Sequence, residues 1–141
     1  MNNYRKQYRS WQFLGTAIIT LWLVIIMGNS HAATINLSAN QCEVSMTVVS
    51  ADCDAGQCSG DSTCVCASKG DFVIWNIAGD DKFKMKFSGD SPLKDNCGKN
   101  FKGKKHKCKV KDTVSKGQSY SYEIYLERCS NGTDPRIIIK S

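Results

Sequence analysis

The sequence predicts an all-β protein: an antiparallel sandwich or small barrel of six or seven short strands, crosslinked by disulfides. Three observations lead to this prediction. Apolar and polar side chains alternate with a period of two along several short runs, as in strands with one buried face. After residue 33, no run of ten or more residues shows the spacing of an amphipathic helix. The 141 residues contain eight cysteines, enough for four crosslinks.

The first segment has the features of a secretory signal peptide. Residues 1–12 carry three basic residues and no acid, and residues 13–27 are uncharged. Ser30 and Ala32 fit the −3 and −1 positions, so we predict a signal peptide over residues 1–32 with cleavage after Ala32. The alternative is an uncleaved anchor, but the 15 uncharged residues would span only about 22 Å of the roughly 30 Å hydrocarbon core. We therefore expect an exported chain, periplasmic or secreted, with no membrane span after cleavage.

The mature chain is expected to be a single β domain over residues 33–141. Alternating or β-rich runs predict strands over residues 42–48, 72–77, 83–87, 107–111, 120–126 and 136–140. The turn Gly79-Asp80-Asp81 separates the second run from the third, so these two are expected to form a hairpin. Residues 50–69, a cysteine-rich insertion, and residues 88–106 are polar and turn-rich, and we expect no strand in either.

The third of these runs has the strictest alternation in the chain. Its apolar residues face one side and its lysines the other, so one face must lie in the core and the other in solvent. The lysines are interpreted as gatekeepers on an edge strand, where charge prevents pairing with a second chain. The apolar residues are Phe83, Met85 and Phe87, and the lysines are Lys82, Lys84 and Lys86.

Several short motifs follow one another between Asp71 and Ser141, about half of the chain. They are Val73-Ile-Trp75-Asn76, then Phe83-x-Met85-x-Phe87 followed by Ser91-Pro92, then Gly117-x-x-Tyr120-x-Tyr122, and last Asp134-Pro135-x-Ile137-Ile138. In this order they resemble copper-free members of the cupredoxin-like superfamily, which are small exported proteins. The resemblance implies an antiparallel Greek-key β-sandwich.

The resemblance does not extend to a copper centre. A blue-copper site needs two histidines and a cysteine thiolate. After cleavage His106 is the only histidine left, and no histidine lies between Cys129 and Pro135. We therefore expect no cofactor. His106 lies among lysines and belongs to no recognisable catalytic motif, so the protein is predicted not to be an enzyme and to have no catalytic residue.

The even number of cysteines predicts four disulfides, because an exported chain meets an oxidising environment. Cys97 and Cys108 flank a glycine-rich basic loop, which a disulfide between them would close. Cys42 would then join Cys129 and link the first predicted strand to the region before the last one. The remaining four cysteines are expected to pair among themselves.

These four are Cys53, Cys58, Cys64 and Cys66. Cys64 and Cys66 would share one face of an extended chain, so they are not expected to pair with each other, and the order of the two disulfides stays open. One alternative function is a thiolate site for Zn²⁺ or Cu⁺ built from all four sulfurs. A second alternative is thiol–disulfide exchange, which needs an exposed reducible pair such as Cys64/Cys66.

The charges of the chain are strongly segregated. Residues 82–111 hold eleven lysines and two acids, whereas residues 33–81 hold seven acids and one lysine. Such a basic segment indicates an anionic partner, here an anionic lipid, a glycan or an acidic protein. Phe101 is the one aromatic residue in the basic loop 97–109, so a nucleic-acid partner is not expected. The predicted binding residues are Lys99, Lys102, Lys104, Lys105, Lys107 and Lys109. The sequence thus favours a small non-catalytic binding protein whose basic loop faces an anionic partner.

Overall fold

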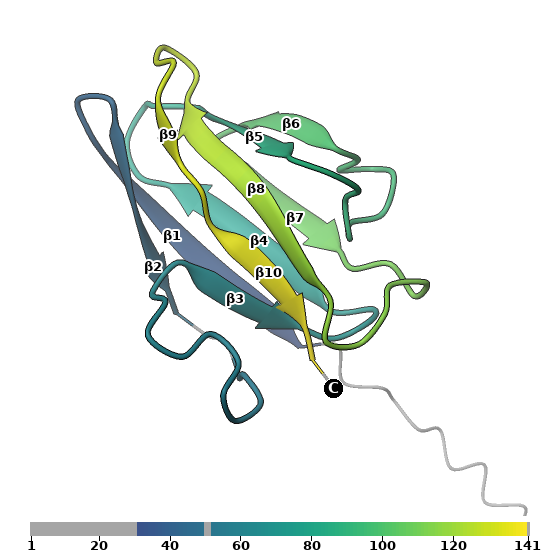
Figure 1. The fold of residues 1–141 in the computed structure, drawn as a ribbon. Helices are drawn as coiled ribbons and strands as arrows, with labels where there is room; N and C mark the ends of the chain where they lie inside the picture. Colours follow the sequence, from purple (N-terminus) through teal and green to yellow (C-terminus); the bar gives the residue numbers. More distant parts are fainter. Residues whose placement is uncertain (1–30, 50–51, 141) are drawn as a thin grey trace, which may run out of the picture.

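The computed structural model describes residues 31–49 and 52–140. These residues form two β-sheets that lie face to face, and they contain no helix (Figure 1). The all-β prediction is therefore confirmed. The strands are β1 (Ala32–Asn40), β2 (Glu43–Val48), β3 (Cys64–Ala67), β4 (Phe72–Ile77), β5 (Phe83–Phe87), β6 (Asn100–Gly103), β7 (Lys105–Lys109), β8 (Ser119–Leu126), β9 (Gly132–Thr133) and β10 (Arg136–Ile139).

The two sheets contribute side chains to one core. The four-stranded sheet has the order β2-β1-β4-β7. The larger sheet has the order β3-β10-β8-β5-β6, and β9 pairs with β8. The largest fully buried side chains include Trp75 from the first sheet and Tyr122, Phe83 and Phe87 from the second. Alternation along β5 and β8 therefore predicts correctly which side chains enter the core.

Both sheets are mixed, whereas the sequence predicted antiparallel pairing throughout. β1 runs parallel to β4, with Ile35 opposite Trp75, and β3 runs parallel to β10, with Val65 opposite Ile137. Parallel neighbours need a long connection between them, and in both pairs the intervening chain builds strands elsewhere. Side chains alternate in the same way in parallel and antiparallel strands, so the pattern does not distinguish the two.

The predicted hairpin of residues 72–77 and 83–87 is wrong. β4 pairs with β1 and β7, whereas β5 pairs with β6 and β8 in the facing sheet. The link between β4 and β5 passes Gly79, whose φ is +76°, and carries the chain from one sheet to the other. Trp75 and Phe83 then enter the same core from opposite sides. The same side chains are buried whether the two strands form a hairpin in one sheet or lie in opposite sheets, so the alternation is compatible with either connection.

The gatekeeper interpretation of Lys82, Lys84 and Lys86 is also wrong. β5 has a hydrogen-bonded neighbour on each side, β6 and β8, so it is not an edge strand. A lysine there does not block the addition of another chain. The edge strands of the described sheets are β2 and β7 in the first and β3 and β6 in the second.

Four strands lie outside the predicted runs: β1, β3, β6 and β9. β3 falls within residues 50–69, and all four of its residues are buried, so no alternation marks it. β6 falls within residues 88–106 and has a single apolar side chain, Phe101. β1 precedes the first predicted strand, although its sequence carries the signal: Ala33, Ile35 and Leu37 alternate with polar residues and are buried.

All eight cysteines form disulfides. Cys42 pairs with Cys129 and Cys97 with Cys108, as the sequence predicts. The order that the sequence left open is Cys53 with Cys66 and Cys58 with Cys64. Four disulfides are typical of proteins that function outside the reducing cytosol.

The predicted signal peptide lies outside the described residues except for its last two positions, His31 and Ala32. β1 already begins at Ala32. The His31 backbone N–H donates to the Asp71 carboxylate at 3.1 Å, and the His31 carbonyl accepts from the Phe72 N–H at 3.0 Å. A chain that began at Ala33 would lack both hydrogen bonds. Residues 31–49 and 52–140 contain no helix with the length and hydropathy of a membrane span.

Candidate functional site

The six predicted binding lysines do not form a single loop. The segment from residue 99 to residue 109 builds β6 in one sheet and β7 in the other, and it crosses between the sheets at Gly103 and Lys104. Three of the lysines lie on β7, and the others lie before β6, on β6 and at the crossing. The structure therefore divides the predicted basic loop into separate surfaces.

The largest aligned group is the β7 row, which we define as Lys105, Lys107 and Lys109. These lysines lie opposite Asn76, Ile74 and Phe72 on the outward face of the four-stranded sheet. The Nζ atom of Lys107 is 4.2 Å from the centre of the Phe72 ring, and that of Lys109 is 5.9 Å away. Each contact places a cation over an aromatic face. The row thus has three ammonium groups above a partly apolar floor.

β7 is held firmly along its second half. The backbone of Leu93 pairs with that of Val110, and the Lys94 N–H donates to the Lys109 carbonyl at 2.8 Å. The disulfide from Cys97 reaches Cys108, which is fully buried. The inward residues of β7 are thereby fixed in the core, and the lysines between them are directed to solvent.

The other three predicted lysines lie outside the row, and two of them have acidic partners. Lys104 forms an ion pair with Asp80 at 2.8 Å, and Lys102 forms one with Glu127 at 3.3 Å. The hydrogen bond from Lys104 and its charge lower the pKa of Asp80. Lys99 is exposed at the turn before β6, where its carbonyl accepts from the Phe87 N–H. Only part of the predicted set is therefore free to meet an external anion.

A second basic surface, which was not predicted from the sequence, lies on the larger sheet. This β5–β6 group consists of Lys84, Lys86 and Lys102, which share the outward face of neighbouring strands. With Tyr125 it lines an open groove of about 370 Å³. Lysines alternate with buried or half-buried residues on both strands, but this pattern predicts a shared basic surface only once β5 and β6 are known to pair. Glu123 and Glu127 lie beside these lysines and offset part of their charge.

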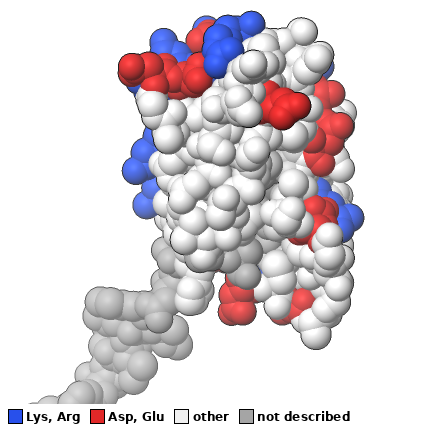
Figure 2. Space-filling view, turned by 90° about the vertical axis from the view of Figure 1, so that its left-hand side faces the viewer, with Lys and Arg blue, Asp and Glu red and all other residues white. Residues whose placement is uncertain are grey.

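The side of the molecule formed by β2 differs from these two basic surfaces in its distribution of charge. Figure 2 shows this side: charged residues lie at the top, along both edges and at the bottom, and the middle of the face is uncharged. Val49, at 60% exposure, is the exposed large hydrophobic residue of the described chain. Grooves of about 820 Å³ and 560 Å³ lie along β2, next to β9 and next to the cysteine-rich insertion. An anionic partner is not expected on this face, since it lacks a row of cations.

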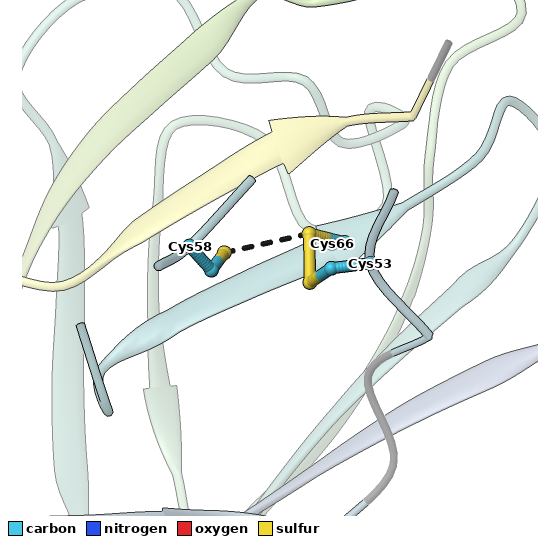
Figure 3. A group of neighbouring side chains, drawn as sticks. All are labelled: Cys53, Cys58 and Cys66. Atoms are coloured by element: carbon cyan, nitrogen blue, oxygen red, sulfur yellow. Dashed lines mark hydrogen bonds between the residues drawn. A yellow bond between two sulfur atoms is a disulfide. The ribbon is translucent and has the colours of Figure 1, made fainter. Parts of the chain in front are cut away.

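The sulfur cluster, defined as Cys53, Cys58, Cys64 and Cys66, lies over the outer face of β3. Figure 3 shows three of its members: Cys53 and Cys66 are bonded, and the Sγ atom of Cys58 approaches Cys66 at 3.4 Å. Cys64 and Cys66 are buried, at 4% and 2% exposure. They do not form the exposed pair that the thiol–disulfide hypothesis requires, because each is bonded to a loop cysteine instead.

His106 faces away from the lysines that surround it in the sequence. Its ring lies on the inward side of β7, with its centre 4.5 Å from that of Phe101 and 5.6 Å from that of Phe83. The Nε2 atom is buried and has no hydrogen-bond partner among the described residues. The imidazole therefore packs as part of the aromatic core between the two sheets.

No protein-family model, no curated protein and no solved structure matches this chain. The surfaces described above are therefore the basis on which a function can be argued.

Proposed function

We propose that this protein is an exported, non-catalytic binding protein that holds a linear acidic glycan on the β7 row. The observation that carries the proposal is the row itself. Lys105, Lys107 and Lys109 occupy alternate positions of one edge strand, and none forms an ion pair with a described carboxylate. Alternate residues of a strand are about 6.7 Å apart, so the backbone positions of the three lysines span roughly 13 Å. A chain with regularly spaced sulfates or carboxylates can meet all three together.

The floor of the row favours a glycan over a lipid surface. Half-buried Ile74 offers a small apolar surface to the C–H face of a sugar ring, whereas the Phe72 ring is already covered by the ammonium groups of Lys107 and Lys109. Stable attachment to a bilayer also needs side chains that insert into it. The exposed hydrophobic side chain of the described residues, Val49, follows β2 at the opposite edge of the sheet. A membrane bound at the row would therefore contact its lysines, but Val49 would lie too far away to insert into the bilayer.

The four disulfides and the predicted signal peptide support an extracytoplasmic location, where acidic glycans occur. We propose further that the two facing sheets form a Greek-key sandwich of the cupredoxin-like type. The support is that the motifs which carry the resemblance lie on β4, β5, β8 and β10, in the interior of the fold. An experimental structure with a different strand connection would contradict this relationship.

Salt elution from an immobilised sulfated polysaccharide tests the glycan proposal. The variant Lys105→Gln/Lys107→Gln/Lys109→Gln should elute at lower salt than the wild type, with about 10-fold weaker binding, because three exposed ion pairs of about 0.5 kcal/mol each total about 1.5 kcal/mol. Binding of the wild type should weaken as ionic strength rises, since exposed charges are screened.

The matched control is Lys84→Gln/Lys86→Gln/Lys102→Gln, which removes the same charge from the β5–β6 group on the other sheet. This control should elute close to the wild type. Equal losses in both variants would show that net charge alone drives binding, and unchanged elution of the β7 variant would contradict the proposal. Stronger binding to vesicles of anionic phospholipid than to the polysaccharide would identify a lipid partner instead and overturn it as well.

A further inference from the structure

The sulfur cluster brings together four cysteines of one short stretch of chain, residues 53–66, in which a loop folds back over the strand that follows it. Cys64 and Cys66 lie on the outer face of β3, two positions apart, and Cys53 and Cys58 come from the loop that covers it (Figure 3). The sulfurs of Cys53, Cys58 and Cys66 all lie within 4.8 Å of one another. The fourth sulfur, that of Cys64, is bonded to Cys58. The cluster is thus a compact group of four sulfurs and not two separate crosslinks.

This arrangement is close to that of a four-thiolate metal site. Zn²⁺ binds cysteine sulfur at about 2.3 Å in tetrahedral geometry, which places neighbouring sulfurs about 3.8 Å apart. The Sγ atoms of Cys58 and Cys66, which are not bonded to each other, are already 3.4 Å apart. Breaking the two S–S bonds would let each bonded pair open to the same separation. Small movements of the side chains would then be sufficient.

The loop and its neighbour suit such a site. Gly56, Cys58 and Gly60 all have positive φ, between 55° and 85°, so the loop is wound into tight turns over β3. Arg136 lies opposite Cys64 on β10, and its guanidinium forms an ion pair with Asp61 at 3.1 Å. This ion pair ties the loop to β10 beside Cys64.

We infer that the sulfur cluster is a redox-gated site for a thiophilic metal ion, with Zn²⁺ bound by Cys53, Cys58, Cys64 and Cys66 once both disulfides are reduced. Each disulfide accepts two electrons and two protons from a dithiol donor, which itself leaves as a disulfide. The four resulting thiols lose protons to solvent as four Zn–S bonds form. With all four deprotonated, the centre carries a net charge of −2. This inference is independent of the proposed glycan binding.

The test uses the full chain, reduced under anaerobic conditions with a phosphine and then freed of it. Zn²⁺ alone is added, and its affinity is measured by competition with a chromophoric chelator. The reduced protein should bind one Zn²⁺ per chain, whereas the oxidised protein should bind none. Replacing Zn²⁺ with Co²⁺ should give the intense visible absorption of a tetrahedral thiolate centre.

The informative variant is Cys53→Ser/Cys58→Ser, which removes the two loop ligands and leaves β3 unchanged. It should bind Zn²⁺ about 100-fold more weakly or not at all. The matched control, Cys97→Ser/Cys108→Ser, removes one disulfide elsewhere and should keep the wild-type affinity. Equal binding by the two variants would overturn the inference, as would a reduced wild type that binds no stoichiometric Zn²⁺.

Near-ultraviolet circular dichroism monitors whether the reduced chain remains folded, because buried Trp75 and Tyr122 report on core packing. If reduction removes this signal, Zn²⁺ should restore it, because an ion that binds only the folded chain shifts the folding equilibrium toward that state. A reduced protein that stays unfolded in excess Zn²⁺ would contradict the inference.

Discussion

At the scale of single residues, the most informative contact joins the two sheets through the core. The Trp75 Nε1–H donates to the Tyr122 hydroxyl at 3.3 Å, and the rings meet edge to face with centres 6.1 Å apart. Both side chains are fully buried. Burial raises the pKa of Tyr122 well above that of a tyrosine in water, so the hydroxyl stays protonated.

Tyr122→Phe should lower the free energy of unfolding by about 1–3 kcal/mol, because it leaves the indole N–H buried without an acceptor. Urea denaturation followed by tryptophan fluorescence measures this loss. The control Tyr125→Phe changes a half-buried tyrosine on the outer face of the same strand and should stay within about 0.5 kcal/mol of the wild type. Similar losses in the two variants would contradict a specific role for the Trp75 hydrogen bond.

Asp61 gives the fold a predictable response to acid. The Thr63 hydroxyl and backbone N–H, with a further contribution from the charge of Arg136, lower the pKa of Asp61 below 3.8. A carboxyl whose pKa is lower in the folded state stabilises the fold above its unfolded pKa, and this stabilisation is lost as the pH falls through the folded value. Asp61→Asn should therefore be less stable than the wild type at pH 7.

The difference in stability between Asp61→Asn and the wild type should shrink as the pH falls below about 4. Urea denaturation at a series of pH values measures it. Asp95→Asn, which removes an exposed carboxylate from the turn before β6, should cost less at pH 7. A difference between Asp61→Asn and the wild type that stays constant down to the acid limit would contradict the prediction.

At the scale of elements, the crossing from β6 to β7 depends on a glycine. A Cβ atom added to Gly103 would lie 2.7 Å from Nε2 of His106, whose ring packs against Phe83 and Phe101. The backbone can therefore lie this close to the imidazole only because residue 103 has no side chain. This contact lies where the basic segment divides between the two sheets, so it helps to separate the β7 row from the β5–β6 group.

Gly103→Ala should destabilise the protein by about 1–3 kcal/mol, since the ring has no room to move away from the new methyl group. Gly89→Ala is the matched control: it adds a methyl group in open space and should change the stability by no more than about 0.5 kcal/mol. Thermal unfolding of both variants measures the difference. If Gly103→Ala is as stable as this control, the ring is free to shift and the crossing does not require glycine.

β7 also takes the protective role that the sequence assigned to β5. It is an edge strand, and every second residue along it is a lysine that lies on the outward face. Charge at such positions opposes the addition of a strand from another chain. Binding and protection are compatible in one row, because a glycan pairs with the ammonium groups and makes no use of the strand's backbone.

At the scale of the whole molecule, the disulfides divide by the length of chain that they close. Cys42–Cys129 spans 87 residues and links the β1–β2 turn to the end of β8, whereas Cys58–Cys64 spans 6. The entropy removed from the unfolded chain grows with the length of the closed loop. Long-range crosslinks therefore contribute most to the stability of a domain of this size, which has a modest core.

Cys42→Ala/Cys129→Ala should cost about 4–5 kcal/mol of unfolding free energy, and Cys58→Ala/Cys64→Ala about 2 kcal/mol. Chemical denaturation of the oxidised variants measures both. A greater loss from the shorter disulfide would show that its contribution is local packing around buried Cys64 rather than chain entropy.

The sequence by itself determined the features that depend on neighbouring residues. Alternation identified the core faces of β2, β5, β7 and β8, because adjacent side chains of a strand must point to opposite sides. The position of Cys97 and Cys108 on either side of one loop predicted their pairing, and Cys42–Cys129 followed as the remaining pair; the structure confirms both. The sequence located the basic segment, but not the division of its lysines.

Only the tertiary structure decided which strands are neighbours. β4 and β5 separate into opposite sheets, β1 and β3 take parallel partners, and Lys102 and Lys107 come to lie on different faces. The convergence of Cys58 on Cys66 likewise follows from the path of a loop with no periodic pattern. The physical reason is that the backbone groups of every strand are chemically alike. The hydrophobic alternation of a strand determines which of its side chains are buried, but the packing of the whole chain determines which strands it pairs with.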